Sequence, residues 1–158
     1  MRHHPPRLPE SRYRGRVSAV FTACEEPRRG LLANGEVHSV VRECLEFACE
    51  RHLCSVPAYI LMPDHLHALM LGDEDESDLN RAFITFKRLS GSAFRRIDSP
   101  ARWQDSYYDR VIRGDWTTQV RYLLRNPYRA NLIDHGHVWL YAGAIRHDPY
   151  EIAWDIAI

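Results

Sequence analysis

The sequence predicts a single α+β domain, and three features carry that prediction. A length of 158 residues fits one compact domain and is long enough to bury a core. Residues 37–52 and 79–96 repeat apolar side chains at the spacing of an amphipathic helix. Shorter runs around them alternate apolar and polar residues, as strands do. The chain shows no internal repeat and no linker, so we expect one domain over residues 15–158 after a flexible arm over residues 1–14.

The first half of the chain is expected to contain a strand, a helix and a hairpin. Residues 15–24 alternate with a period of two and predict the first strand. The helix that follows presents one apolar face, made of Val37, Val40, Val41, Cys44, Leu45 and Ala48. Strands are predicted at about residues 55–62 and 65–71, and the Pro63-Asp64 step between them marks a turn.

The second half is expected to contain a long helix, a short strand and a third helix. Ser77 or Asp78, at the end of an acidic loop, can cap the long helix. A strand is predicted near residues 107–112. A third helix should then run from Asp115 to about Asn126, where the proline that follows ends or kinks it. The C-terminal tail gives no clear pattern.

Composition excludes several classes of protein. The chain has no apolar run of 18 residues, so we expect no membrane span. Its N-terminus has no apolar segment typical of a secretory signal. The four cysteines form no CxxC pair, which favours free thiols in a reducing compartment over a disulfide framework or a zinc site. We therefore expect a cytoplasmic protein.

Charge is unevenly distributed along the chain, although the formal net charge is zero. Residues 79–133 hold eleven basic and four acidic side chains, whereas residues 31–78 hold two basic and ten acidic ones. A basic segment of this kind can bind phosphate. The candidates on the second predicted helix are Arg81, Lys87, Arg88, Arg95 and Arg96. The same pattern also fits an ordinary solvated helix face.

Two histidines share one face of the predicted strand over residues 65–71. His65 and His67 are two residues apart, and side chains alternate along a strand, so both imidazoles point the same way. Such a pair can bind one divalent metal ion. The spacing by itself also occurs in histidines that have only a structural role.

Tyr122 and Asn126 lie one turn apart on the third predicted helix. The spacing of four residues places the phenol and the amide one above the other, away from the core side chains Val120 and Leu124. The helix therefore presents a phenol and an amide oxygen together. An exposed tyrosine with no functional role gives the same pattern.

Four segments together resemble the single-tyrosine HUH transposases, in the branch of REP-associated tyrosine transposases. Within residues 59–133 and in the expected order, they are YILMPDHLHALM, FKRLSGSAFRRI, RWQDSYYDRVIR and YLLRNPYRANLI. The first contains the His-hydrophobic-His motif that gives the family its name. The resemblance does not extend to the region from Gly136 onward.

The resemblance implies a fold, a reaction and a set of site residues. The fold is a ferredoxin-like central antiparallel sheet with helices packed on it. His65 and His67 would hold Mg²⁺ or Mn²⁺, with Asn126 completing the metal site at a position where related transposases often have glutamine. Tyr122 would attack single-stranded or hairpin DNA and form a 5′-phosphotyrosine intermediate. Relatives act as homodimers or as monomers, and the sequence does not distinguish these states.

Three alternatives remain open from the sequence. Tyr107 and Tyr108 are rival nucleophiles, although their predicted strand beside Trp103 favours aromatic packing or base stacking. Tyr128, a second phenol near Tyr122, is a further rival. The chain could be a domesticated DNA-binding module without catalytic activity. It could also be a metal-dependent hydrolase that forms no covalent intermediate.

Overall fold

The computed structural model describes residues 7–147, so the first six residues of the predicted arm and the tail 148–158 lie outside it. The described chain contains one sheet and four α-helices. The strands are β1 (Ser18–Cys24), β2 (Cys54–Leu61), β3 (His65–Gly72), β4 (Tyr108–Ile112) and β5 (Ala142–Ile145). The helices are α1 (Gly35–His52), α2 (Leu79–Arg96), α3 (Thr117–Leu124) and α4 (Asn126–Arg129), and a 3₁₀ turn, η1, covers Glu10–Tyr13.

All neighbouring strands are antiparallel, and their order in the sheet is β4-β1-β3-β2-β5. The chain runs β1-α1-β2-β3-α2-β4 before it reaches α3, which is the ferredoxin-like connectivity. The predicted α+β fold with a ferredoxin-like antiparallel sheet is confirmed. β3 lies at its centre, bonded to β1 on one side and to β2 on the other.

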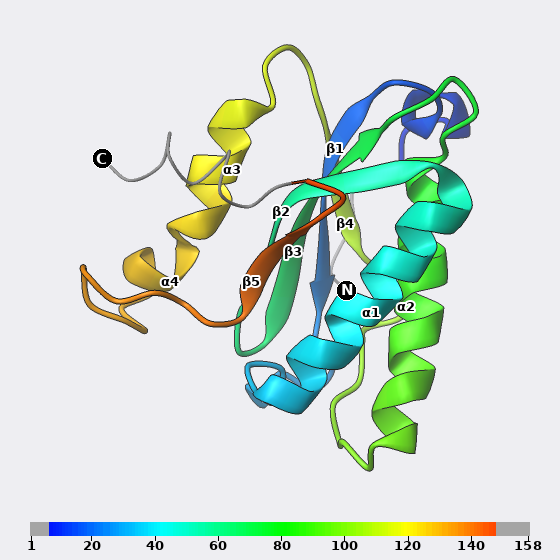
Figure 1. The fold of residues 1–158 in the computed structure, drawn as a ribbon. Coiled ribbons are helices and arrows are strands. Elements are labelled where there is room, and N and C mark those ends of the chain that lie inside the picture. Colours follow the sequence, from blue (N-terminus) through cyan, green and yellow to red (C-terminus); the bar gives the residue numbers. More distant parts are fainter. Residues whose placement is uncertain (1–6, 148–158) are drawn as a thin grey trace.

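Helices cover both faces of the sheet, but unequally. Figure 1 shows α1 and α2 side by side on one face and α3 on the other. On β3, Leu66 and Met70 point into the larger core beneath α1 and α2. Leu69 faces the other way and packs with Val120 and Leu123 of α3. The histidines occupy the same side of β3 as Leu69, because side chains two residues apart share a face.

Residues 7–14 differ from the expected flexible arm, because they pack against the sheet. Tyr13 is 1% exposed, and its hydroxyl donates a hydrogen bond to the carboxylate of Asp109 on β4. The Arg7 guanidinium lies 3.8 Å from the centre of the Tyr107 ring and donates to its hydroxyl at 2.8 Å. One buried aromatic ring anchors this segment, and a single anchor produces no apolar period for sequence analysis to detect.

The helix boundaries follow local capping chemistry. Asn34 accepts a hydrogen bond from the Val37 N–H at 3.0 Å and caps α1. Asp78, one of the two predicted caps, accepts from the Arg81 N–H at 2.9 Å and caps α2. Asp115 accepts from the Thr117 N–H at 2.9 Å, at the start of α3. The third helix ends at Leu124, earlier than predicted, and α4 begins at Asn126 with a proline in its first turn.

The tail that gave no sequence pattern contributes β5. This strand pairs with β2 at the sheet edge, and the segment before it is tied to the same strand. The Trp139 indole N–H donates to the Leu61 carbonyl at 2.9 Å, and the Leu61 N–H donates to the Tyr141 carbonyl at 2.8 Å. β5 has only four residues, two of them alanine and one glycine, which is too short and too small to show an alternating pattern.

Two expectations from composition can be compared with the structure. Within residues 7–147, we find no helix with the length and apolar character needed to cross a membrane. All four cysteines are free thiols, as predicted, and three of them are buried.

Phe83 on α2 is expected to be a main contributor to the stability of the fold. Its ring stacks on Phe21 at 4.7 Å between centroids and is fully buried. Phe83→Ala should lower the free energy of unfolding by about 3–5 kcal/mol, because it leaves a cavity in the core. Ile84→Ala, the adjacent residue that is 46% exposed, should cost less than about 1 kcal/mol. Urea denaturation of both variants tests this, and equal losses would contradict the assigned core.

Candidate active site

His65 and His67 lie side by side on the α3 face of β3. Their ring centroids are 4.7 Å apart, and the ring planes are nearly perpendicular. The intervening Leu66 is fully buried in the opposite core, which fixes the direction of both imidazoles. The shared face predicted from the sequence is confirmed.

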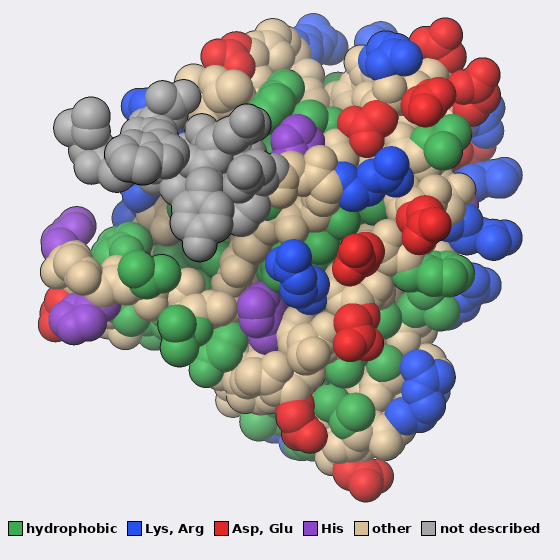
Figure 2. All heavy atoms as spheres, viewed as in Figure 1, with side chains coloured by type: hydrophobic (Ala, Val, Ile, Leu, Met, Phe, Trp, Pro, Cys, Tyr) green, Lys and Arg blue, Asp and Glu red, His purple; other side chains and the backbone are tan. Residues whose placement is uncertain are grey.

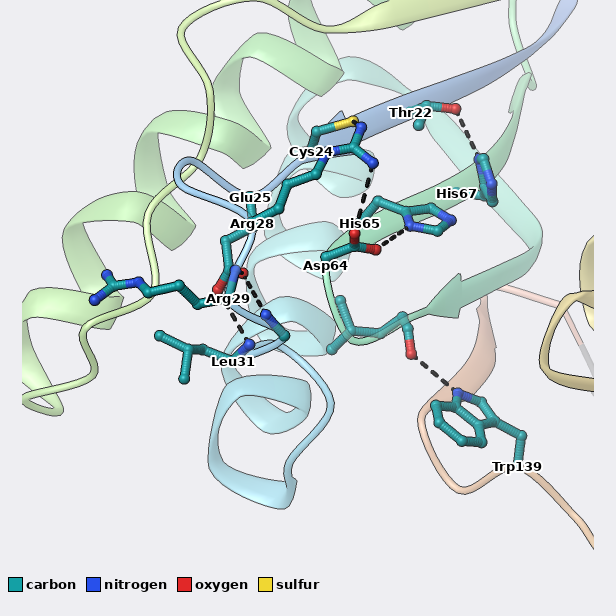
Figure 3. Close-up of polar contacts among 12 residues, drawn as sticks. Thr22, Cys24, Glu25, Arg28, Arg29, Leu31, Asp64, His65, His67 and Trp139 are labelled. Carbon is teal, nitrogen blue, oxygen red and sulfur yellow. Dashed lines mark hydrogen bonds and ion pairs between the residues drawn. The ribbon is translucent and has the colours of Figure 1, made fainter. Parts of the chain in front are cut away.

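Each imidazole is oriented by a hydrogen bond to its Nδ1 atom (Figure 3). Asp64 Oδ1 lies 2.7 Å from Nδ1 of His65, and Thr22 Oγ1 lies 2.7 Å from Nδ1 of His67. An ionised carboxylate can only accept, so Nδ1 of His65 donates in this hydrogen bond and Nε2 is the nitrogen that can bind a metal ion. Arg28 lies 3.5 Å from the other oxygen of Asp64 and orients that carboxylate in turn. This arrangement is typical of histidines whose Nε2 atom binds a metal ion.

The electrostatic environment favours neutral His67. Burial lowers the pKa of His67 to about 4, and the positive charges of His65 and Arg129 act in the same direction. Burial alone would raise the pKa of Asp64, but the hydrogen bond and charge of His65 bring it below its usual value. At neutral pH the site therefore presents an uncharged imidazole and an ionised carboxylate, the forms required of a metal ligand and its supporting residue.

Tyr122 faces the same groove as His67. The groove lies between α3 and the part of the sheet formed by β1, β3 and β4, and it has a volume of about 670 Å³. It is lined by Val20, Thr22, His67, Tyr108, Asp109, Arg110, Thr118, Gln119, Tyr122 and Leu123. Tyr122 is 57% exposed, so its hydroxyl is open to a substrate. His65 and Asn126 do not line this groove.

Arg129 connects the predicted nucleophile with the predicted third ligand. Its guanidinium lies 3.9 Å from the centre of the Tyr122 ring, and its Nη2 donates to the Tyr122 carbonyl at 2.9 Å. The same nitrogen donates to Asn126 Oδ1 at 3.0 Å. Sequence analysis missed Arg129. Arg129 lies seven residues, or two helical turns, after Tyr122, and this spacing could have indicated the contact. The third helix is predicted from the sequence to end at about Asn126, however, so Arg129 falls outside it.

The histidine pair fits a divalent metal ion better than Asn126 does. Two imidazoles whose Nδ1 atoms are already hydrogen-bonded can offer their Nε2 atoms as part of a ligand set. Imidazole suits Mn²⁺ better than Mg²⁺. The Asn126 amide is instead held locally, since Nδ2 donates to the Leu123 carbonyl at 3.1 Å and Oδ1 accepts from Arg129. In the part of the chain that the structure describes, no three His, Cys, Asp or Glu side chains form a metal-binding group.

The basic residues predicted on α2 lie on the face of the sheet opposite the histidines. α2 packs with α1 over the larger core, and Figure 2 shows Lys and Arg side chains gathered along the side where α2 lies. Lys87 has a structural role in this position: its ammonium group donates to the carbonyls of Gln104, Asp105 and Ser106 at 2.5–3.1 Å. Burial lowers the pKa of Lys87 to about 8, although nearby Asp105 acts in the opposite direction.

The rival tyrosines occupy different environments. Tyr107 is 7% exposed within the larger core, its hydroxyl donates to Asn80, and burial raises its pKa. Tyr128 donates its hydroxyl to the His137 carbonyl. Tyr108 is half-buried and lines the same groove as Tyr122. Of the rivals, Tyr108 therefore shares the groove, whereas the Tyr107 phenol is engaged in the core.

Comparison with known proteins identifies the fold. No family model and no curated protein matches the sequence. A solved structure of a REP-associated tyrosine transposase bound to a REP hairpin matches with a TM-score of 0.67 and 17% identity, covering 84% of this chain and 76% of that chain. A proposed transposase from Deinococcus radiodurans R1 matches with a TM-score of 0.51 and 19% identity, covering 83% and 97%. The chain has the fold of these transposases. The predicted resemblance is confirmed at the level of the fold.

Lys87 should contribute to stability through the segment it holds. Lys87→Ala removes the donor for three carbonyls and is expected to lower the free energy of unfolding by about 1–3 kcal/mol. Arg88→Ala, at the neighbouring exposed position, should change it by less than about 0.5 kcal/mol. Thermal and urea unfolding of the two variants measure the difference. Equal stability of the two variants would show that Lys87 is solvated like the other basic residues of α2 and has no structural role.

Proposed function

We propose that this chain is a transposase-like enzyme that cuts and rejoins single-stranded or hairpin DNA, with Tyr122 as its nucleophile. The observation that carries the proposal is that Tyr122 and His67, from α3 and β3, line one groove. The fold supports it, because the transposases that share the fold include one bound to a hairpin. The orientation of both imidazoles by Asp64 and Thr22 adds support, since a hydrogen bond at Nδ1 leaves Nε2 as the nitrogen that can bind a metal ion.

The proposed reaction exchanges one phosphodiester bond for another. The Tyr122 hydroxyl oxygen attacks the phosphorus atom, a tyrosine–phosphate bond forms, and the bond to the 3′ oxygen breaks. The phenol proton passes to water, which reaches the largely exposed ring, and the departing 3′ oxygen takes up a proton. The products are a 5′-phosphotyrosine and a 3′-hydroxyl. A second 3′-hydroxyl can reverse the step and rejoin strands without ATP.

The residues that would hold a divalent metal are His65 and His67, with Asn126 as a third ligand. When bound, Mg²⁺ or Mn²⁺ would supply Lewis-acid polarisation of the scissile phosphate. Both imidazole ligands are neutral in this role. Asn126 Oδ1 has a second lone pair besides the one that accepts from Arg129, so it can serve both partners.

Arg129 supplies a positive charge beside the nucleophile. Its contacts with the Tyr122 ring and carbonyl place the guanidinium next to the groove. A guanidinium binds phosphate oxygens through paired N–H donors. We assign it the role of neutralising the phosphate during attack, while its bond to the Tyr122 carbonyl connects α4 to α3.

Tyr122→Phe is expected to abolish the covalent protein–DNA product, because phenylalanine has no hydroxyl to attack phosphorus. Purified protein is incubated with labelled hairpin DNA and Mn²⁺, and adducts are resolved on a denaturing gel. Tyr128→Phe, whose hydroxyl bonds to a backbone carbonyl in the following loop, is the matched control and should retain the adduct.

The other outcomes of this experiment distinguish the alternatives. An adduct that survives Tyr122→Phe and is lost in Tyr108→Phe would move the nucleophile to Tyr108. Cleavage without an adduct, unaffected by Tyr122→Phe, would indicate the hydrolase. Binding of several hairpins with neither cleavage nor adduct would indicate a DNA-binding module.

Arg129→Met should slow adduct formation by about 100-fold or more, the usual effect of removing a charged group that stabilises a transition state. Arg125→Met removes an exposed arginine one turn earlier and should change the rate by less than about threefold. Single-turnover gel assays measure the rate, and fluorescence anisotropy measures DNA affinity in parallel. A rate equal to that of the control variant would overturn the assigned role.

A further inference from the structure

We propose that single-stranded DNA leaves the groove across the edge of β4 and enters a second hollow lined by arginines of the N-terminal segment. This path, the edge track, consists of Tyr108, Arg110, Arg113, Arg12 and Arg7. The inference rests on the proposed function, because the groove with Tyr122 and His67 is its starting point. It places DNA on a different surface from the basic face of α2.

The first observation is that the two hollows meet at β4. The second hollow has a volume of about 420 Å³, and it shares Tyr108, Asp109 and Arg110 with the groove. β4 lies at the end of the sheet, so side chains on both of its faces reach the boundary between the hollows. A flexible strand can therefore pass from one hollow to the other over a single β-strand.

The second observation is the charge of the second hollow. Among the described residues that line it, the charged ones are four arginines and one aspartate: Arg7, Arg12, Arg110, Arg113 and Asp109. Asp109 accepts a hydrogen bond from buried Tyr13, so one of its carboxylate oxygens is already hydrogen-bonded within the protein. The hollow thus carries excess positive charge, which suits a phosphate backbone.

The third observation indicates a single strand as the occupant. Tyr108 is half-buried and borders both hollows, and an aromatic ring in that position can stack on a base. Bases of a duplex are stacked on one another and do not reach such a ring, whereas unpaired bases do. Arginines beside an aromatic side chain are the usual composition of a single-strand groove.

The N-terminal segment gains a role from this placement. Arg7 and Arg12 reach the second hollow because Tyr13 and Arg7 fasten residues 7–14 to β4 and Tyr107. By contrast, the exposed arginines of α2 lie across the sheet from Tyr122, and a strand held there would have to pass around the domain to reach the groove.

The test compares two charge-reversal double variants in Tyr122→Phe protein, so that binding is measured without reaction. Arg12→Glu/Arg113→Glu alters the edge track, and Arg88→Glu/Arg95→Glu alters α2 by the same charge. The probe is a fluorescent 15-nucleotide oligothymidine, and anisotropy is recorded over a range of salt concentrations.

The edge-track variant should bind at least tenfold more weakly, and its slope of log K against log salt should fall by about 1.4, or about 0.7 for each lost phosphate contact. The α2 variant should stay within twofold of its parent. Equal weakening of the two variants, or greater weakening of the α2 variant, would overturn the inference.

A second pair of variants tests Tyr108 without changing charge. Tyr108→Ala should weaken oligothymidine binding by about fivefold or more, since stacking on one base is lost, whereas Tyr108→Phe should retain it. Equal loss in both variants would contradict a stacking role and with it the path across β4.

The two proposals fail separately. If wild-type protein forms no adduct but the edge-track variants lose binding, the surface stands and the enzymatic role does not. If wild-type protein forms the adduct while the edge-track and α2 variants bind equally well, the enzymatic role stands and the track is wrong.

Discussion

The pairing of β3 between β1 and β2 is the constraint on which the rest of the structure depends. Hydrogen bonding on both sides fixes the register of β3, and register decides which side chains face which layer. Leu66, Ala68 and Met70 are committed to the larger core, which leaves His65 and His67 on the opposite face. A shift of one residue would bury both imidazoles under α1 and α2. The stability of the core and the position of the candidate site are therefore set by the same pairing.

The unequal covering of the sheet creates space for chemistry. Two helices of 18 residues each close one face, whereas α3 has only eight residues and leaves a groove between itself and β4. The polar residues of the site lie on this partly open face, where water and a substrate can reach them. The larger core on the other face supplies the rigidity that keeps the two histidines in place.

The candidate site is short of negative charge. His67 is neutral, and the Asp64 carboxylate is engaged by His65 and Arg28. Asp109 and Arg110 both line the groove, and Arg129 adds a positive charge beside Tyr122. Such a set suits an anion, such as a phosphate of the proposed DNA substrate. The second hollow, across β4, also has an excess of positive charge, because its arginines outnumber its single aspartate. Although the whole chain is neutral, both hollows of the proposed path are suited to a polyanion.

The sequence by itself determined the elements with strong local patterns: α1, α2, the strands with alternating or continuous apolar runs, and the shared direction of His65 and His67. These follow from backbone periodicity, which is local. Only the tertiary structure decided that Tyr122 meets His67 in one groove, that Arg129 joins Tyr122 to Asn126, and that Lys87 binds carbonyls. It also placed residues 7–14 and β5, whose order comes from a buried ring and from an available sheet edge. Most of these arrangements depend on contacts between segments far apart in the chain, which no local pattern encodes. The contact of Arg129 with Tyr122 spans only seven residues, but it crosses the break between α3 and α4, which helical periodicity does not predict.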